Sequence, residues 1–373
     1  MSVLSRASRV FLGCISGAAL WLKALSVPAA ALITGVNLVN PLNASIADQN
    51  ALIAQLKAAD VKVVRVFLKP EDADIDFAKR LNAQGIRMEL DLPLRYPPNG
   101  PTRANNPKFS GIWGGPLLSS ADPELSKTYY QSMLDKLEGN GIALAGLELS
   151  NEINTAGYNR DIPLPGAGRN FSLADLQHDP EGQQIAKSFL QYLKVLAVLK
   201  DVRDHSKLNR QTPLISVGLA DLGIPEGPHP NTQADSVSIN ATLGFLRANG
   251  LDNLVDGYGI HTYPWGNVSP SDRMKHFEKD VITLCHPAAS GKGKPCWMTE
   301  WGLPNNRSCP LDDTNRTNVA TSVMNDFRSL AKQGRLAAAL YFFWQDPSSK
   351  TVDQYTIFRC GSLTPTGKAA LTP

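Results

Sequence analysis

The stretch that decides the fold is Leu147-Glu148-Leu149-Ser150-Asn151-Glu152-Ile153-Asn154. Its first residues, opened by Ala145-Gly146, are typical of a short buried strand, and the polar residues Ser150, Asn151 and Glu152 follow where that strand ends. A carboxylate at the carboxyl end of a barrel strand is where (β/α)₈ enzymes place their chemistry. The stretch therefore predicts a parallel barrel strand with a reactive glutamate at its end.

A second stretch of the same kind is Pro295-Cys296-Trp297-Met298-Thr299-Glu300-Trp301-Gly302. It too is a largely apolar run that ends in a glutamate, Glu300. Two carboxylates, one to protonate and one to attack, are the minimum equipment for cleaving a glycosidic bond. The two stretches therefore predict Glu152 and Glu300 as a catalytic pair.

Apolar runs and helical spacing alternate along the rest of the chain. Besides the two stretches above, strands are expected over 32–38, 61–67, 86–91, 213–218, 255–261 and 338–344. Helices are expected over 43–59, 72–84, 123–140, 182–205, 238–249, 272–285 and 314–334. Eight strands that alternate with helices indicate the α/β class and a (β/α)₈ TIM barrel. Residues 32–373 are expected to form one catalytic domain, with the long loop 93–122 over the barrel mouth.

The first 31 residues differ from the rest. Arg6 and Arg9 precede an apolar run from Val10 to Leu22, and Pro28-Ala29-Ala30-Ala31 supplies small residues. This layout is typical of a secretory signal peptide, and the run is short for a transmembrane helix. We expect an exported protein, periplasmic or secreted. An uncleaved leader that tethers the protein to the membrane is the alternative.

The charge of the chain excludes one class of partner. With 37 basic and 34 acidic residues the net charge is +3, and no cluster of five to eight lysines and arginines appears. A nucleic-acid partner is therefore not expected. We expect a monomer that requires no cofactor.

Four cysteines follow the leader: Cys285, Cys296, Cys309 and Cys360. An even number in an exported protein indicates two disulfides, and pairing of Cys285 with Cys296 and of Cys309 with Cys360 is the simplest of three connectivities. Metal binding is the competing interpretation, but these spacings fit no zinc pattern.

Polar or aromatic residues stand at the ends of six expected strands. They are Asn37, Arg65, Asn151 with Glu152, His261 with Tyr263, Glu300, and Trp344. Taken singly, a buried glutamate, histidine or tryptophan is more often a structural residue than a functional one. All of them, however, fall at the same end of the expected strands, and this shared position favours one active site.

The motifs at these strand ends resemble those of clan A glycoside hydrolases. They are Asn-Glu after strand four, His-x-Tyr after strand six, Glu-Trp-Gly after strand seven and Trp after strand eight. The Val-Arg-Val of strand two and the run Asn151-Glu152-x-Asn154 look most like glycoside hydrolase families 39 and 5. Ile153 departs from the proline that often follows the acid/base, and Asp91 stands near the position where family 5 usually has a histidine.

The resemblance implies a role for each residue. Glu152 would be the general acid/base and Glu300 the nucleophile of a retaining enzyme. Arg65 would hold Glu300 ionised, Tyr263 would hydrogen-bond it, and Asn151 would bind the sugar 2-hydroxyl. The remaining expected substrate-binding residues are Asn37, His261, Trp344, Trp301 and Trp265, of which Trp344 would stack on a sugar ring.

The sequence thus predicts an exported retaining β-glycosidase whose partner is a carbohydrate substrate. Aromatic residues spread over several loops favour endo action, but exo action stays open. One alternative is a barrel that binds carbohydrate without turning it over, and another is a metal-dependent barrel hydrolase that uses His261 and carboxylates. A metal site is not expected, because the strand ends offer one histidine.

Overall fold

The structure is a computed structural model of the chain and describes residues 31–109, 111–229, 234–263, 282–306, 309, 312–345 and 353–373. Apart from residue 31, the expected leader lies outside the described residues. Trp265 and most of the expected helix over 272–285 also lie outside them.

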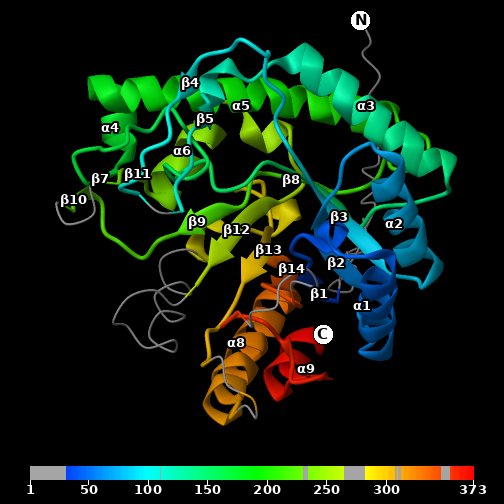
Figure 1. Cartoon of the computed structure of the whole chain (residues 1–373). Coiled ribbons are helices and arrows are strands. Elements are labelled where there is room, and N and C mark those ends of the chain that lie inside the picture. Colours follow the sequence, from blue (N-terminus) through cyan, green and yellow to red (C-terminus); the bar gives the residue numbers. More distant parts are fainter. Residues whose placement is uncertain are drawn as a thin grey trace, which may run out of the picture.

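A curled sheet of parallel strands forms the centre of the molecule (Figure 1), in the order β8-β6-β3-β2-β1-β14-β13-β12-β9. Its strands are β1 (Ile33–Asn37), β2 (Val63–Phe67), β3 (Arg87–Leu92), β6 (Gly146–Leu149), β8 (Leu214–Ile215), β9 (Leu219–Asp221), β12 (Tyr258–Thr262), β13 (Cys296–Trp301) and β14 (Leu336–Tyr341). Neighbours such as β1 and β2, or β13 and β14, run parallel. The expected α/β class and parallel sheet are confirmed.

A closed ladder of eight strands, by contrast, is not what the structure has. The nine-stranded sheet ends at β8 and β9, of which β8 falls within the strand expected over 213–218, whereas β9 begins one residue after it. Isolated bridges join Asn151 to Gly218 and Ile215 to Gly257 across the break.

The cause of the break lies in the residues between β8 and β9. The amide of Val217 donates to the hydroxyl of Tyr192 over 2.8 Å. At Gly218 the backbone passes so close to His261 that a Cβ would lie 2.0 Å from Nε2 of the imidazole. The chain therefore leaves the regular ladder at the point where the His261 ring needs the space.

Helices lie around the outside of the sheet (Figure 1). They are α1 (Ile46–Ala58), α2 (Asp72–Ala83), α3 (Pro123–Gly139), α4 (Leu173–His178), α5 (Pro180–His205), α6 (Ile239–Ala248), α8 (Thr314–Lys332) and α9 (Pro365–Leu371). Side-chain caps fix several starts, for example Ser45 before α1, Asp122 before α3 and Asp179 before α5. Each such cap stabilises a helix by about 1 kcal/mol.

Short elements occupy the connections between the larger ones. The 3₁₀ helices are Pro41–Asn43, Leu118–Ser120, Leu251–Asn253, Ile282–Leu284 and Ala288–Ser290. Outside the main sheet lie the short strands β4 (Thr102–Arg103), β5 (Gly115–Pro116), β7 (Arg169–Phe171), β10 (Gly227–Pro228), β11 (Ser236–Val237), β15 (Phe358–Arg359) and β16 (Ser362–Leu363). The loops after β3 and β6 thus carry small strands of their own.

The inward-facing side chains change from apolar to polar along the strands. Because successive side chains alternate between faces, residues two apart share one. Val63 packs with Ala145 and Leu340 in a small buried cluster, and Arg65 lies two residues further along β2. The same step leads from Gly146 to Glu148 on β6. The inward-facing apolar side chains therefore form a layer of core, on which the inward-facing polar side chains near the carboxyl ends of the strands rest.

Two disulfides close the C-terminal third of the chain. Cys285 is bonded to Cys296, and Cys309 to Cys360. This is the simplest pairing that the sequence allowed, and it is confirmed. Disulfides are typical of proteins that leave the reducing cytosol. Among the described residues, no helix combines the length and the apolarity that crossing a membrane requires.

Candidate active site

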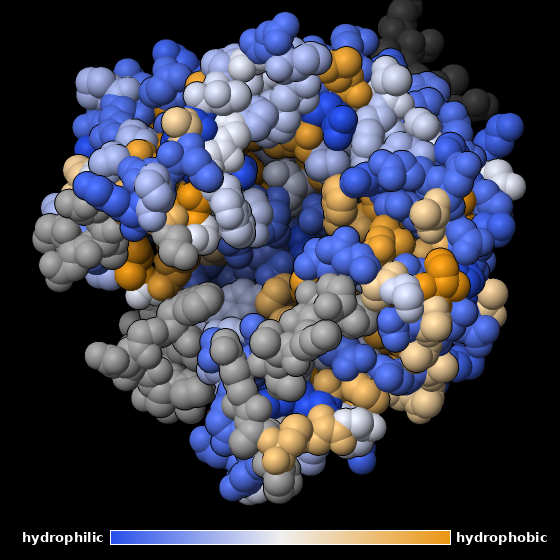
Figure 2. Space-filling view, in the orientation of Figure 1, coloured by the Kyte–Doolittle hydropathy of each residue, from blue (hydrophilic) through white to orange (hydrophobic). Residues whose placement is uncertain are grey.

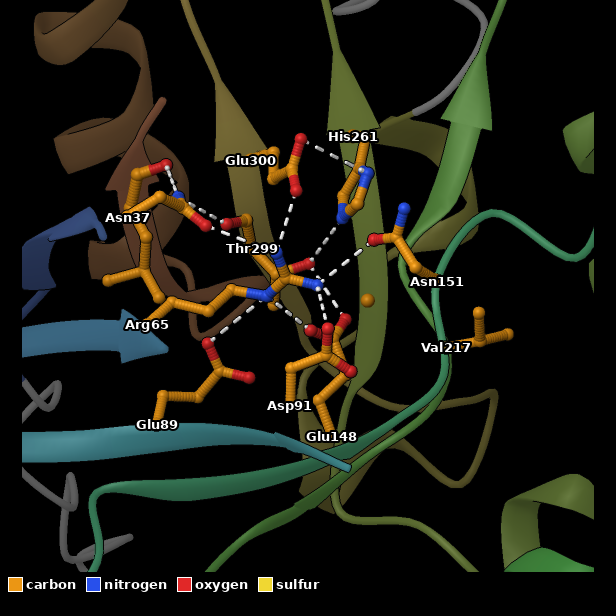
Figure 3. A network of polar contacts seen from close by, with 12 residues as sticks. Asn37, Arg65, Glu89, Asp91, Glu148, Asn151, Val217, His261, Thr299 and Glu300 are labelled. Carbon is orange, nitrogen blue, oxygen red and sulfur yellow. Dashed lines mark hydrogen bonds and ion pairs between the residues drawn. The ribbon is translucent and has the colours of Figure 1, made fainter. Parts of the chain in front are cut away.

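Seven of the residues expected at one site come together where the strands end. They are Asn37 from β1, Arg65 from β2, Asn151 and Glu152 after β6, His261 from β12, Tyr263 after β12, and Glu300 from β13. Figure 3 shows Arg65 in the middle of this network, with carboxylates and amides from several strands turned toward it.

The backbone after β6 makes a sharp turn that places Glu152. Ser150 and Glu152 have φ angles of 69° and 40°, in the left-handed region that non-glycine residues rarely adopt. The amide of Glu152 donates to the carbonyl oxygen of Gly218 over 2.9 Å, which holds the turn against the neighbouring stretch. Strained backbone of this kind clusters at functional sites, and here it fixes the residue that is the expected acid/base.

Glu300 is held as a carboxylate by two donors. Nη1 of Arg65 donates to Oε1 over 2.6 Å, and the hydroxyl of Tyr263 donates to Oε2 over 2.5 Å. Burial raises the pKa of Glu300, but the charges of His261 and Arg65 and these hydrogen bonds outweigh it, so the pKa lies below its ordinary value. Burial and the charge of Glu300 raise the pKa of Tyr263 well above its ordinary value, so the phenol keeps its proton.

Glu152 faces His261. Oε1 of Glu152 lies 2.9 Å from Nδ1 of His261, and about 20% of the Glu152 side chain is exposed. Nδ1 is also 3.6 Å from Oε2 of Glu300. Burial lowers the pKa of His261, but the charge of Glu300 and the hydrogen bond and charge of Glu152 outweigh it and raise the pKa. Glu152 and Glu300 therefore share the histidine as a neighbour but differ in their hydrogen bonds, since Glu300 also accepts from Arg65 and Tyr263.

Arg65 connects the strands below the two glutamates. Its Nε donates to Oε2 of Glu148 over 2.6 Å, Nη1 reaches Oδ1 of Asn37 at 3.1 Å and Nη2 reaches Oδ1 of Asn151 at 3.1 Å. Burial lowers the pKa of Arg65, but the acids around it, Glu148 first, raise it well above its ordinary value. The guanidinium is therefore a permanent charge that fixes the two asparagines and Glu300 together.

Three acids in this network were not among the residues expected at the site. Glu89 and Asp91 lie on β3 with their nearest oxygens 3.6 and 3.5 Å from the guanidinium nitrogens of Arg65, and Glu148 is fully buried beside them. Burial, together with Glu148, raises the pKa of Glu89 well above its ordinary value. Burial also raises the pKa of Asp91 to about 7. The available signal was a carboxylate in the middle of an apolar strand, which seldom occurs without a partner.

A cavity of about 280 Å³ lies above this network. Its lining includes Asn37, Asn40, Arg65, Phe67, Asp91, Asn151, Tyr158, Glu300 and Phe342. Figure 2 shows that the molecule is hollowed near the centre of the drawn face, with hydrophilic side chains around the hollow. Polar groups with a few aromatic rings are what a sugar needs, because a pyranose combines hydroxyls with an apolar face.

Two of the expected substrate-binding tryptophans are buried instead, and the expectation is wrong for both. Trp344 is fully buried, stacks on Phe358 at 5.2 Å between ring centroids, and donates from Nε1 to Gln55 over 3.2 Å. The reason is that β14 ends at Tyr341, three residues earlier than expected, so the chain has turned away before residue 344. The aromatic residue of this segment that lines the cavity is Phe342.

Trp301 is likewise fully buried. Its ring packs edge-on against Phe327 and Tyr341, with centroid distances of 5.4 and 4.9 Å. It follows Glu300 directly on β13, so the alternation of side chains turns it to the opposite face, toward α8. Both tryptophans therefore belong to the core.

Glu152, His261 and Glu300 also satisfy the donor set of a metal site. One ligand atom of each lies within 4.8 Å of the others. The two oxygens of Glu300, however, already accept from Arg65 and Tyr263. A divalent cation would meet the charge of Arg65 a few ångströms away, which opposes its binding. The arrangement therefore favours proton transfer between these groups over metal coordination.

Comparisons with known proteins give a likeness in fold. No family model and no curated protein matches the chain in sequence. A broad-specificity endoglucanase of group GH5-4 from an uncultured bacterium has a TM-score of 0.53 at 14% identity, over 93% of this chain and 95% of that one. The endo-1,4-β-mannanase from Rhizomucor miehei has a TM-score of 0.51 at 13% identity, over 91% and 93%.

A longer protein is similar in the same way. The exo-β-1,4-mannosidase from Opitutaceae bacterium strain TAV5 has a TM-score of 0.52 at 12% identity over 92% of this chain. This chain spans only 59% of the length of that mannosidase. At such low identities the likeness establishes the fold alone, and this chain has the fold of these endoglucanase, mannanase and mannosidase structures.

Proposed function

We propose that the chain is a retaining β-glycosidase that hydrolyses O-glycosidic bonds of a polysaccharide or oligosaccharide by double displacement. The observation that supports this proposal most is the approach of Glu152 and Glu300, which bring one carboxylate oxygen each within 4.8 Å of the other. Carboxyl groups about 5 to 5.5 Å apart are typical of retaining enzymes, whereas inverting enzymes need roughly 6.5 to 9.5 Å to admit a water. Residues 32–373 would form the single catalytic domain, and the protein would act as an exported monomer.

In the first step, Glu300 would attack the anomeric carbon while Glu152 gives its proton to the leaving oxygen. The glycosidic bond breaks and an ester between the sugar and Glu300 forms. In the second step, Glu152 would take a proton from water, whose oxygen attacks the same carbon and releases Glu300. Arg65 and Tyr263 support this cycle because they stabilise Glu300 as a carboxylate before attack and after release.

The asparagines and His261 would orient the reacting groups. Oδ1 of Asn151 accepts from Nη2 of Arg65 over 3.1 Å, and Asn151 lines the cavity, which suits a hydrogen bond from its amide group to the sugar 2-hydroxyl. Asn37 donates to the carbonyl of Thr299 over 2.9 Å and so positions the end of β13. His261 would act on the proton of Glu152, 2.9 Å away.

The ring of Phe342 would take the place that the sequence suggested for Trp344. It lines the cavity beside Glu300, and Tyr158 and Phe67 supply further exposed aromatic surface, with 40% and 43% of these residues accessible. Aromatic faces on several sides of the site favour endo action on a β-linked glycan. A cell-wall or exopolysaccharide glycan would suit an exported enzyme.

The proposal is tested by incubating the purified protein with a panel of β-linked glycans and following the first product by NMR. We expect the product to form with the β configuration, and an α product would contradict the retaining mechanism. Reaction of glycine variants with azide then distinguishes which glutamate is the nucleophile and which is the acid/base. In Glu300→Gly, azide attacks in place of the missing nucleophile and yields an α-glycosyl azide. In Glu152→Gly, azide attacks the sugar ester and yields the β-glycosyl azide.

Binding and catalysis are separated by the Glu300→Gln variant. We expect it to lose turnover by a factor of about 1,000 or more and to retain sugar binding in calorimetry. Glu124→Gln, at an exposed position of α3, serves as the matched control. Sugar binding by a wild-type protein that turns over none of the glycans would support the non-catalytic alternative. Loss of wild-type activity on chelation would support the metal-dependent alternative.

A further inference from the structure

A chain of hydrogen bonds runs from Glu152 into the interior. Oε1 of Glu152 lies 2.9 Å from Nδ1 of His261, and Nε2 of the same ring lies 3.1 Å from Oγ1 of Thr299. The Thr299 hydroxyl in turn lies 2.9 Å from Oε1 of Glu148. His261, Thr299 and Glu148 are buried, so water does not compete for the contacts among these three residues. The positions of the protons in this series of hydrogen bonds can be deduced by starting from Glu148.

At that end Glu148 is an acceptor. Its other oxygen, Oε2, accepts from Nε of Arg65 over 2.6 Å, which is typical of an ionised carboxylate. A hydroxyl has one hydrogen to donate, and Thr299 gives it to Glu148. Toward His261 the Thr299 oxygen can therefore only accept. The hydrogen bond at 3.1 Å requires a proton on Nε2 of the imidazole.

Nδ1 is thereby left as the ring atom that faces Glu152. With Nε2 protonated, a neutral His261 accepts the Glu152 proton at Nδ1, and a charged His261 donates from Nδ1 to the Glu152 carboxylate. These two forms differ only in the position of one shared proton. The ring packs closely against the backbone at Gly218, where an added Cβ would lie 2.0 Å from Nε2, so it cannot shift toward that side.

Charged groups on several strands act on this histidine. They are Glu152 after β6, Glu300 on β13, Arg65 on β2 and Asp91 on β3, with Glu148 behind Thr299. Their balance raises the pKa of His261 despite its burial. The hydroxyl of Thr299 adds to this balance, since an acceptor at Nε2 stabilises the doubly protonated ring.

We propose that Thr299 is a positioning residue that, by donating to Glu148, keeps the proton of His261 on Nε2 and makes Nδ1 the atom that shares one proton with Glu152. The catalytic part of this inference, that Glu152 shares its proton with His261 during turnover, rests on the proposed function. The hydrogen-bond direction itself does not require that function, so it can be measured separately.

The first measurement is an NMR titration of the histidine ring nitrogens in the full chain, with His261 assigned by comparison with His261→Gln. In the wild type we expect neutral His261 to carry its proton on Nε2. Thr299→Val keeps the shape and removes the acceptor, so we expect the Nδ1-protonated form to appear and the proton affinity to fall by about three- to tenfold. Thr299→Ser, which restores a hydroxyl, should return the wild-type spectrum.

The second measurement is the pH profile of kcat/KM. We expect its basic limb to move to lower pH in Thr299→Val, because the shared proton is held less tightly, and to return in Thr299→Ser. Thr262→Val is the matched control, since Thr262 is fully buried on β12 and its hydroxyl has no hydrogen-bond partner within the described part of the chain. Its profile should match that of the wild type.

The same tautomer and titration in Thr299→Val as in the wild type would overturn the inference, and so would a Thr299→Ser variant that behaves like Thr299→Val. If Thr299→Val does not fold, Thr299→Ala carries the same expectation. If the wild type cleaves no glycan, the proposed function fails, while the NMR comparison still decides the role of Thr299.

Discussion

Nη1 of Arg65 lies 2.6 Å from Oε1 of Glu300, at a place where 7% and 10% of the two side chains reach solvent. A charge pair in such surroundings is strongly coupled, because removal of one partner leaves the other uncompensated. The same guanidinium also binds Glu148 through Nε, so one residue holds a carboxylate on each of two strands. The site therefore depends on the planar shape of Arg65 as well as on its charge.

Arg65→Lys tests this dependence on shape. Lysine keeps a positive charge but lacks the planar group that reaches Glu148 and Glu300 at once. We expect kcat/KM to fall about 10- to 100-fold, as for the loss of a charged hydrogen bond, and its acidic limb to move to higher pH because the pKa of Glu300 rises. Arg87→Lys, at an exposed position of β3, is the control. An Arg65→Lys variant with wild-type kinetics would contradict the role proposed for the planar guanidinium.

Tyr263→Phe removes one donor from Glu300 and leaves the ring in place. Since the phenol donates to Oε2 over 2.5 Å, its loss should lower kcat/KM about 10- to 100-fold and again raise the pKa of Glu300. The pH profile of kcat/KM is the measurement. Tyr355→Phe alters a neighbouring ring, 5.3 Å from Tyr263 between centroids, without touching this hydrogen bond. An equal effect of both variants would attribute the loss to packing.

Asp91 makes the free energy of unfolding depend on pH. Its pKa is raised from 3.8 to about 7 in the folded chain, so between these values the folded state binds more protons than the unfolded state. Stability should therefore fall as the pH rises from about 4 to about 7. The raised pKa of His261 acts in the same direction, since its contribution is present below about 6.5 and lost above its folded pKa.

Urea unfolding at several pH values measures this effect. In Asp91→Asn the fall in stability between about pH 4 and 7 should become shallower, because the group that titrates differently in the two states is gone. Glu300 acts in the opposite sense at lower pH, because its depressed pKa gives stability that is lost on acidification. If the free energy of unfolding of Asp91→Asn changed with pH as steeply as that of the wild type, other titratable groups would be responsible for the pH dependence.

Phe342 and Trp344 should differ in what they support. Phe342→Ala removes the ring from the cavity and is expected to lower kcat/KM about tenfold, through loss of stacking with the sugar. Trp344→Phe removes a hydrogen bond to Gln55 and part of the packing on Phe358, so it should lower the melting temperature and leave KM unchanged. If KM rose in Trp344→Phe but not in Phe342→Ala, residue 344 and not residue 342 would be the one that stacks on the sugar.

The two disulfides should contribute unequally to stability. The bond between Cys309 and Cys360 closes a sequence separation of 51 residues and that between Cys285 and Cys296 one of 11. In the chain-entropy picture these loops correspond to about 4 and about 3 kcal/mol. Replacement of each pair by alanine, followed by urea unfolding, measures the difference. A larger loss for the short loop would show that native packing around Cys285 and Cys296 outweighs the entropy of the unfolded chain.

The sequence predicted the positions at which the strands end and therefore which distant residues meet. Apolar runs before Arg65, Glu152, His261 and Glu300 carry that information, because the carboxyl ends of parallel barrel strands lie at the same edge of the sheet. The buried acids Glu89, Asp91 and Glu148 were missed as a group, since nothing local to a strand says that its charged residue has partners on two others. These partners are recognised only when the contacts between neighbouring strands are known.

Trp344 and the interrupted stretch 214–221 show the same limit. In an aromatic run such as 341–344 the strand could end at any of several residues. Because β14 ends three residues earlier than expected, Trp344 lies in the core and not at the sugar-binding site. The break between β8 and β9 follows from the bulk of the His261 ring, which belongs to another strand. Both outcomes depend on neighbours that are remote along the chain.

The close passage of Gly218 against His261 also bears on how this protein can be varied. A library that randomises position 218 should return glycine almost exclusively, although the residue carries no reactive group and offers nothing to a sugar. Attempts to widen substrate range would do better to diversify Phe67, whose exposed ring lines the cavity. Substitutions are therefore expected to be tolerated at the exposed lining of the cavity and to fail at Gly218, which packs directly against a buried side chain of the site.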